Sequence, residues 1–127
     1  MKVAVLIADD NEEMSAVLAE ILSWDGHYVE TATDGRIALE RLRARPFDLV
    51  LSDVRMAGMD GPSLYRALAQ QEAPSRPLFV FMTGDADTLP KATLDLVEQT
   101  AIPMLRKPLM MEDVEQLVNR LLTDSPR

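Results

Sequence analysis

The sequence contains no cysteine, which excludes disulfide bonds, thiolate metal sites and a thiol nucleophile. It also lacks an apolar run of about 18 residues, the length that a membrane-spanning helix needs. The apolar stretch near the N-terminus leads directly into the acidic pair Asp9-Asp10, which is not the pattern of a cleavable signal peptide. These absences fit a protein of a reducing compartment with no membrane span, and we expect a cytoplasmic location.

Basic side chains are scarce relative to acidic ones. The 13 Lys and Arg residues stand against 21 Asp and Glu residues, so the formal net charge is -8. A charge of this sign repels nucleic acid phosphates and anionic lipid headgroups. We therefore expect no direct nucleic acid binding and no membrane association by this chain.

The length of 127 residues, with 47% hydrophobic and 27% charged residues, is typical of one globular domain. We expect this domain over residues 1–122, followed by a polar tail or the start of a linker over residues 123–127. Within the domain, short apolar runs alternate with segments of helical periodicity, which predicts an α/β fold: a doubly wound, five-stranded parallel sheet with helices on both faces. The expected strands cover residues 3–8, 28–32 (at a sheet edge), 47–52, 78–82 and 102–105.

A helix is expected after each strand. In the first helix the apolar residues recur at helical spacing, and we expect Met14 and Trp24 to pack against the interior. The fourth helix has the weakest pattern. Asp87 would cap it, Pro90 would lie in its first turn, where a missing N–H costs little, and it would end near Gln99.

Polar residues follow four of the expected strands: Asp9-Asp10, Asp53, Thr83 and Lys107. The carboxyl ends of parallel strands share one edge of a sheet, and ligands bind there where the strand order reverses. If the first strand lies between the second and third, the three carboxylates become neighbours, and a pair about 4 Å apart repels by roughly 4 kcal/mol at an effective dielectric constant near 20. Either a proton or a cation must then compensate the charge, and an all-oxygen site favours Mg²⁺ or a similar hard ion.

This set of residues suits phosphoryl transfer. A metal ion and an ammonium group neutralise the charge of a transferring phosphoryl group, and a hydroxyl can donate to one of its oxygens. A carboxylate can itself be the nucleophile and form an aspartyl phosphate. The sequence therefore predicts a phosphoryl pocket at the carboxyl edge of the sheet.

Four motifs place these residues in a fixed order along the chain: VLIADDNEEM with Asp9-Asp10, DLVLSDVRMAGMDG with Asp53, FVFMTGD with Thr83, and MLRKPL with Lys107-Pro108. In this order the chain resembles a response-regulator receiver domain of two-component signalling, from Lys2 to about Leu122. The resemblance implies a flavodoxin-like (β/α)5 fold with strand order 2-1-3-4-5. It also implies a switch that catalyses its own phosphorylation and dephosphorylation, and no enzyme acting on a separate metabolite.

The resemblance further implies a role for each site residue. Asp53 would accept a phosphoryl group from the phosphohistidine of a sensor histidine kinase or a phosphotransfer protein, or from a small acyl phosphate. Lys107 would pair with the phosphoryl oxygens, and Thr83 would move toward them. The Lys107-Pro108 bond would be cis, and Gly61 would belong to the turn before the third helix.

The resemblance implies a Mg²⁺ site as well. Asp10, Asp53 and the backbone carbonyl of Arg55 would bind the ion directly, and Asp9 would act through a metal-bound water. The phosphorylated state would change a surface that an effector domain or protein partner reads, in a monomer or a phosphorylation-dependent homodimer.

Two positions depart from the usual pattern of the family. Met104 occupies the place of a frequent aromatic switch residue, and Ala57 replaces a usual proline. Two other functions stay open: a degenerate receiver used only for docking, and a Mg²⁺-dependent phosphohydrolase with an aspartyl-phosphate intermediate. The phosphohydrolase would need a second aspartate two residues after the nucleophile, where this chain has Arg55.

Overall fold

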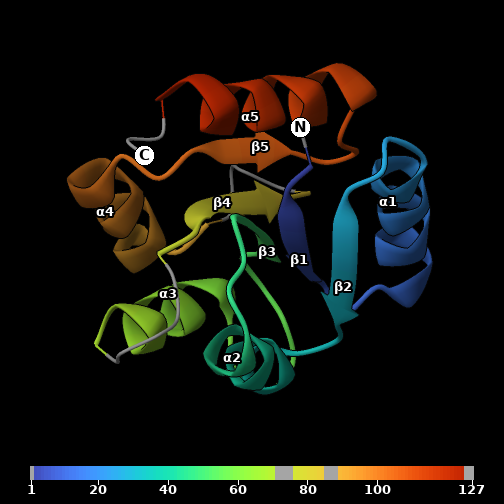
Figure 1. Ribbon diagram of the computed structural model, residues 1–127. Coiled ribbons are helices and arrows are strands. Elements are labelled where there is room, and N and C mark those ends of the chain that lie inside the picture. The colour runs from blue at the N-terminus through green and yellow to red at the C-terminus, as the bar shows by residue number, and fades with distance from the viewer. Residues whose placement is uncertain (1, 71–75, 85–88, 125–127) are drawn as a thin grey trace.

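The computed structural model describes residues 2–70, 76–84 and 89–124. Strands and helices alternate through these residues (Figure 1). Their order is β1 (Ala4–Ala8), α1 (Glu12–Trp24), β2 (Tyr28–Ala32), α2 (Gly35–Ala44), β3 (Leu49–Asp53), α3 (Gly61–Ala69), β4 (Leu78–Thr83), α4 (Lys91–Thr100), β5 (Met104–Arg106) and α5 (Met111–Asp124).

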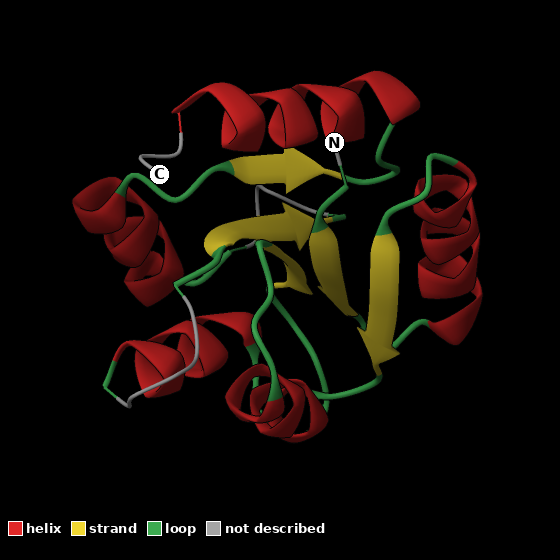
Figure 2. Cartoon of the chain, in the orientation of Figure 1, coloured by secondary structure: helices red, strands yellow, loops and turns green. Residues whose placement is uncertain are grey.

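The five strands form one parallel sheet in the order β2-β1-β3-β4-β5, which confirms the predicted fold (Figure 2). The inner strands β1, β3 and β4 are almost entirely buried, as expected for continuous apolar runs covered on both faces. The more polar β2 lies at one edge, as predicted, and the three-residue β5 lies at the other.

The sheet separates two apolar cores, because successive strand residues point to opposite faces. Helices α2, α3 and α4 cover one face, and α1 and α5 cover the other (Figure 1). On the first face Leu42, Leu64 and Leu96 pack against Val50 and Phe81. On the second face the packing residues include Leu22, Leu117, Val118, Ile7 and Leu51.

Three helices begin at side chains that cap the free N–H groups of the first turn. Asn11 caps α1 by accepting from the Met14 N–H at 3.1 Å, and Asp60 caps α3 in the same way. Such caps fix where a helix starts, since the cap residue itself takes an extended conformation. Asp34 caps α2 by accepting from the N–H groups of Arg36 and Ile37, so all three helices start at a defined residue after the strand or loop that precedes them.

The fourth helix and the last strand differ from the expectation. Helix α4 begins at Lys91, with Pro90 at the N-cap position rather than inside the first turn and with no side-chain cap; the predicted cap, Asp87, lies outside the described residues. Strand β5 starts at Met104 and β3 at Leu49, each two residues later than predicted; Phe47 and Ile102, which were expected in these strands, are buried in the core just before them. Helix α5 runs from Met111 to Asp124.

Two side chains expected in the interior are exposed. Met14 is 39% and Trp24 is 72% accessible to solvent. The inward face of α1 is set by Ser15 and Leu22, which lie seven positions apart and are buried. Trp24 comes two residues after Leu22 and so projects from nearly the opposite side of the helix. No helix in the described part of the chain is long and apolar enough to cross a membrane.

His27 gives the fold a pH-dependent contact, because its Nδ1 accepts a hydrogen bond from the Val3 N–H at 3.1 Å. Burial lowers the pKa of His27 below its ordinary value of 6.5, and Lys2 adds to this while Asp25 opposes it. The unfolded chain therefore binds the proton more readily, so stability falls as the pH drops below 6.5. Between pH 7.5 and 5.5 we expect the free energy of unfolding to fall by about 1 kcal/mol, the net contribution of one hydrogen bond.

Urea unfolding at a series of pH values measures this effect. The matched control is His27→Gln, which retains an acceptor oxygen and does not titrate. The variant should lose less stability over this pH range than the wild type. Equal losses in both proteins would mean that His27 is not the group responsible.

Candidate functional site

The parallel strands all end at the same edge of the sheet. At four of these ends, the last residue of the strand or the residue after it belongs to the predicted site. Asp9 follows β1, Asp53 ends β3, Thr83 ends β4 and Lys107 follows β5. The register pairs Ala8 with Ser52, so Asp9 and Asp53 come from neighbouring strands. Lys107 is held at this edge by its own N–H, which donates to the Thr83 carbonyl oxygen at 2.8 Å.

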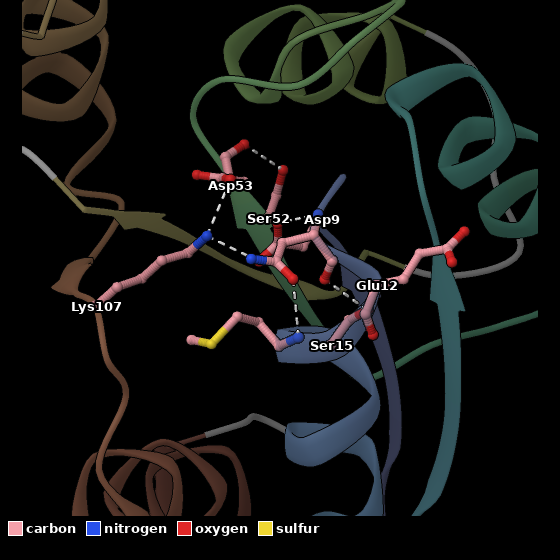
Figure 3. Close-up of polar contacts among 8 residues, drawn as sticks. Asp9, Glu12, Ser15, Ser52, Asp53 and Lys107 are labelled. Carbon is pink, nitrogen blue, oxygen red and sulfur yellow. Dashed lines mark hydrogen bonds and ion pairs between the residues drawn. The ribbon is translucent and has the colours of Figure 1, made fainter.

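Lys107 joins the two carboxylates. Its Nζ donates to Asp9 Oδ2 at 2.8 Å and to Asp53 Oδ2 at 3.0 Å. Figure 3 shows the lysine side chain reaching from the end of β5 toward both acids. The other oxygen of Asp9 accepts from the Asn11 N–H at 2.9 Å. Asp9 is only 2% exposed, and each of its two carboxylate oxygens accepts a hydrogen bond, as a buried carboxylate requires.

One ammonium shared by two acids leaves the cluster with excess negative charge. Burial raises the pKa of Asp53 above its ordinary value, and the neighbouring Asp9 raises it further while Lys107 opposes the shift. Burial by itself would lower the pKa of Lys107, but its bonds to both carboxylates outweigh burial and raise it. The lysine is thus held in its charged form, and the site still favours a further positive charge.

The donor atoms fit a hard cation. Asp9, Asp10 and Asp53 each offer a carboxylate oxygen, and these oxygens all lie within 4.8 Å of one another. Asp10 is exposed, so the group is open to solvent on its side. Carboxylate oxygens of this number and type suit Mg²⁺ rather than a softer metal.

A cavity of 270 Å³ adjoins the acids and is lined by Asp53, Arg55, Thr83, Gly84 and Lys107. Thr83, the last residue of β4, is 5% exposed. The predicted site residues Asp53, Arg55, Thr83 and Lys107 are therefore brought together around one opening. The lining includes two cationic side chains, Arg55 and Lys107, and the Thr83 hydroxyl, which are groups that a small anion can pair with.

Three other expectations about single positions can be compared with the structure. The Lys107-Pro108 bond is cis, as expected. Gly61 is the first residue of α3 and is buried. Met104 is half-buried and packs against the core under α2, α3 and α4.

Sequence reasoning missed two residues that support the site. The backbone N–H of Asn11 donates to the Asp9 side chain. Asn11 lies two residues after this aspartate, a spacing typical of an Asx turn, and this signal could have identified it. Ser52 is fully buried and its hydroxyl donates to the Asp53 carbonyl oxygen at 3.0 Å. No sequence pattern distinguishes this serine from an ordinary strand residue.

The sequence model of the response regulator receiver domain matches residues 5–119. The chain belongs to this family. It is a receiver domain of the kind found in two-component response regulators, and receiver domains are not by themselves an enzyme family.

Similar proteins include transcriptional regulators and a chemotaxis protein. The transcriptional regulatory protein ZraR of Escherichia coli O157:H7 is 32% identical over 118 residues, which are 93% of this receiver domain and 26% of that protein. The DNA-binding transcriptional regulator NtrC of Escherichia coli strain K12 is 32% identical over 119 residues, 94% of this chain and 24% of that protein. The structure of chemotaxis protein CheY4 from Vibrio cholerae has a TM-score of 0.79 at 26% identity and covers 95% of this chain and 99% of that one. This receiver domain therefore spans about a quarter of the length of the curated relatives.

Proposed function

We propose that Asp53 accepts a phosphoryl group from the phosphohistidine of a sensor histidine kinase or phosphotransfer protein, and that this modification is the signal. The observation that carries the proposal is the Lys107 ammonium between Asp9 and Asp53, 2.8 and 3.0 Å from their oxygens, beside an open cavity. A charged donor fixed at that place is ready to pair with the oxygens of an incoming phosphoryl group.

The transfer involves only the Asp53 carboxylate and the phosphohistidine of the donor as reactants. A carboxylate oxygen of Asp53 attacks the phosphorus atom, and the bond from phosphorus to the imidazole nitrogen breaks. Its electron pair stays on the departing imidazole, and the product is an acyl phosphate on Asp53. Lys107 stabilises the negative charge of the transferring group, and the hydroxyl of Thr83 donates to one of its oxygens.

Asp10, Asp53 and the backbone carbonyl of Arg55 would hold Mg²⁺ in this site, with Asp9 acting through a bound water. The ion would neutralise charge on the phosphoryl oxygens as the group is transferred. An indirect role for Asp9 is supported by its two hydrogen bonds, since both of its oxygens already have protein donors. Asp10 is more exposed, which leaves its carboxylate accessible to an ion from solvent.

The consequence of phosphorylation would be a change in a surface that an effector domain or a separate protein reads. The phosphoryl group would attract Thr83, the last residue of β4, and Lys107, the residue after β5. We place this signalling in the cytoplasm, in a monomer or in a homodimer that forms on phosphorylation. Similarity to ZraR and NtrC supports a regulatory output, though this chain matches only a quarter of their length.

Intact-mass spectrometry after incubation with acetyl phosphate tests the proposal. We expect one added phosphoryl group on the wild type with MgCl₂, none without Mg²⁺, and none on Asp53→Ala. Asp95→Ala is the matched control, because Asp95 is an exposed acid on α4. An adduct on Asp53→Ala would contradict Asp53 as the acceptor.

Beryllofluoride provides a second test that does not depend on the lifetime of the acyl phosphate. Fluorine NMR should show it bound to the wild type in the presence of Mg²⁺ and not to Asp53→Ala. Trp24 is not a suitable reporter, since it is 72% exposed at the far end of α1. A wild type that neither gains a phosphoryl group nor binds beryllofluoride would overturn the proposal in favour of a docking-only receiver.

A further inference from the structure

The loop of residues 54–60, which follows Asp53, rests against the N-terminus of α2. Gly35, the first residue of that helix, is buried under the loop. A Cβ added at Gly35 would lie 2.1 Å from the carbonyl oxygen of Met59 and 2.7 Å from its Cβ. Both atoms belong to or adjoin the backbone, so the loop could not yield by turning a side chain. Glycine is therefore required at position 35 for the loop to lie where it does.

A second contact joins the same two segments. Gly58 has a φ of +77°, and a Cβ added there would lie 3.3 Å from Asp34 Cγ. The Asp34 side chain is fixed, because its Oδ1 accepts from the N–H groups of Arg36 at 2.7 Å and Ile37 at 3.0 Å. The loop thus lies against a side chain that two hydrogen bonds hold in the cap of α2.

Helix α2 is in turn tied to the sheet. Glu30 on β2 binds Arg41 at 2.8 Å and Arg45 at 2.6 Å, near the C-terminal end of α2. Burial alone would raise the pKa of Glu30, but the Tyr28 hydroxyl and the two arginines lower it. The same helix buries Leu39 and Leu42 against the sheet. Its N-terminus is therefore a firm support for the loop.

The loop is also fixed at its two ends. The Val54 N–H donates to the Met82 carbonyl at 3.0 Å, and the Gly61 N–H donates to the Val54 carbonyl at 3.0 Å. Gly61 is so close to Asp53 that an added Cβ would lie 2.4 Å from the Asp53 carbonyl oxygen. Arg55, which lines the cavity, lies between these fixed points.

We infer that Gly35 is a positioning residue for the cation site: it contributes no atom to the site but allows α2 to set the path of the loop backbone that includes Arg55. The inference rests on the proposed function, in which the Arg55 carbonyl is a ligand of Mg²⁺. Its physical basis is that groups behind a ligand determine affinity by fixing the ligand in place, and their loss typically weakens metal binding by about 10- to 100-fold.

Isothermal titration of the full chain with MgCl₂ tests the inference. Gly35→Ala should raise the dissociation constant for Mg²⁺ by about tenfold. Gly58→Ala, which disturbs the second contact between the loop and Asp34 and strains the loop at a φ of +77°, should also raise it. The control is Val118→Ala, which creates a cavity under α5 on the other face of the sheet and should leave Mg²⁺ affinity unchanged. If Gly35→Ala does not fold, Gly58→Ala tests the support of the loop by α2, because its added Cβ lies 3.3 Å from Asp34 and the strain at its φ of +77° falls on the exposed loop itself.

A second readout separates positioning from a general loss of structure. With acetyl phosphate as donor, Gly35→Ala should need about tenfold more Mg²⁺ for half of the maximal phosphorylation rate and still approach the wild-type rate at saturation. Wild-type protein that binds no Mg²⁺ would overturn the proposed metal site itself. Wild-type protein that binds Mg²⁺, with equal affinity in both glycine variants, would overturn only the role of Gly35.

Discussion

Lys107→Met is expected to slow phosphorylation by acetyl phosphate about 100-fold, the usual effect of removing one donor that stabilises developing negative charge. Methionine has a similar length and no charge, so the variant removes the ammonium and keeps much of the packing volume. Both bonds of Lys107, to Asp9 and Asp53, are lost together. The rate is measured by intact mass as a function of time at saturating Mg²⁺. Lys91→Met is the matched control, because Lys91 is an exposed lysine at the start of α4.

The same variant should also be less stable at neutral pH. Breaking a buried ion pair leaves its partner charged and uncompensated, and we expect a loss of about 3 kcal/mol, the low end of the range because the lysine side chain is 18% exposed. Without the ammonium the pKa of Asp53 rises further, since burial and Asp9 already raise it. A carboxyl whose folded pKa exceeds its unfolded value destabilises the fold only where it is ionised. The deficit relative to wild type should therefore shrink as the pH falls toward 4.

Urea unfolding of both proteins between pH 4 and pH 8 measures this deficit. A deficit that stays constant over this range would mean that Lys107 stabilises the fold by packing and not by charge. A phosphorylation rate equal to that of wild type would exclude Lys107 from the transfer step, and the proposed function would then need another cation.

Gly61→Ala is expected to destabilise the fold by about 3 kcal/mol, as an overpacked and unyielding site does. Its new methyl group would lie 2.4 Å from the Asp53 carbonyl oxygen, 3.1 Å from Ser52 Oγ and 3.2 Å from the ring of Phe81. The first atom belongs to the β3 backbone, and Ser52 and Phe81 are fully buried, so none of the three can move aside cheaply. Gly84→Ala is the matched control, since no atom lies within 4 Å of its added Cβ.

The midpoint of urea unfolding measures both variants, and only Gly61→Ala should shift it strongly. Equal and small shifts would show that the β3 strand end can move away from α3. In that case the close approach of the two segments would not be what fixes the Asp53 backbone.

The sequence was sufficient to predict the elements that carry the site. Strands β1, β3 and β4 are mainly apolar runs that end at a polar residue or directly before one, and such runs have few other structures open to them in a domain of this size. The positions of Asp9, Asp53 and Thr83 follow directly from where these runs stop. Lys107 was predicted at a strand end although the start of its short strand was placed two residues too early.

What could not be predicted depends on contacts between distant segments or on the orientation of single side chains. Trp24 is apolar and lies in an amphipathic helix, but only the helix phase set by Leu22 shows that it faces solvent. Gly35 reads as a helix start, and its contact with Met59, 24 positions away, depends on the path of the intervening chain. Local patterns identify the chemistry of the site, and three-dimensional contacts identify what holds it in place.

Strand β5, the shortest of the five, has no fully buried residue and pairs on one side only, with β4. Such an element separates from a fold at a lower free energy than the central strands, through local opening that leaves the rest intact. Yet this strand leads directly to the ammonium that compensates Asp9 and Asp53. Local opening of β5 would therefore withdraw positive charge from the two acids, and an anion bound to Lys107 would oppose that opening. Opening of the β5 edge and binding of an anion at Lys107 would thus be coupled, so that each shifts the equilibrium of the other.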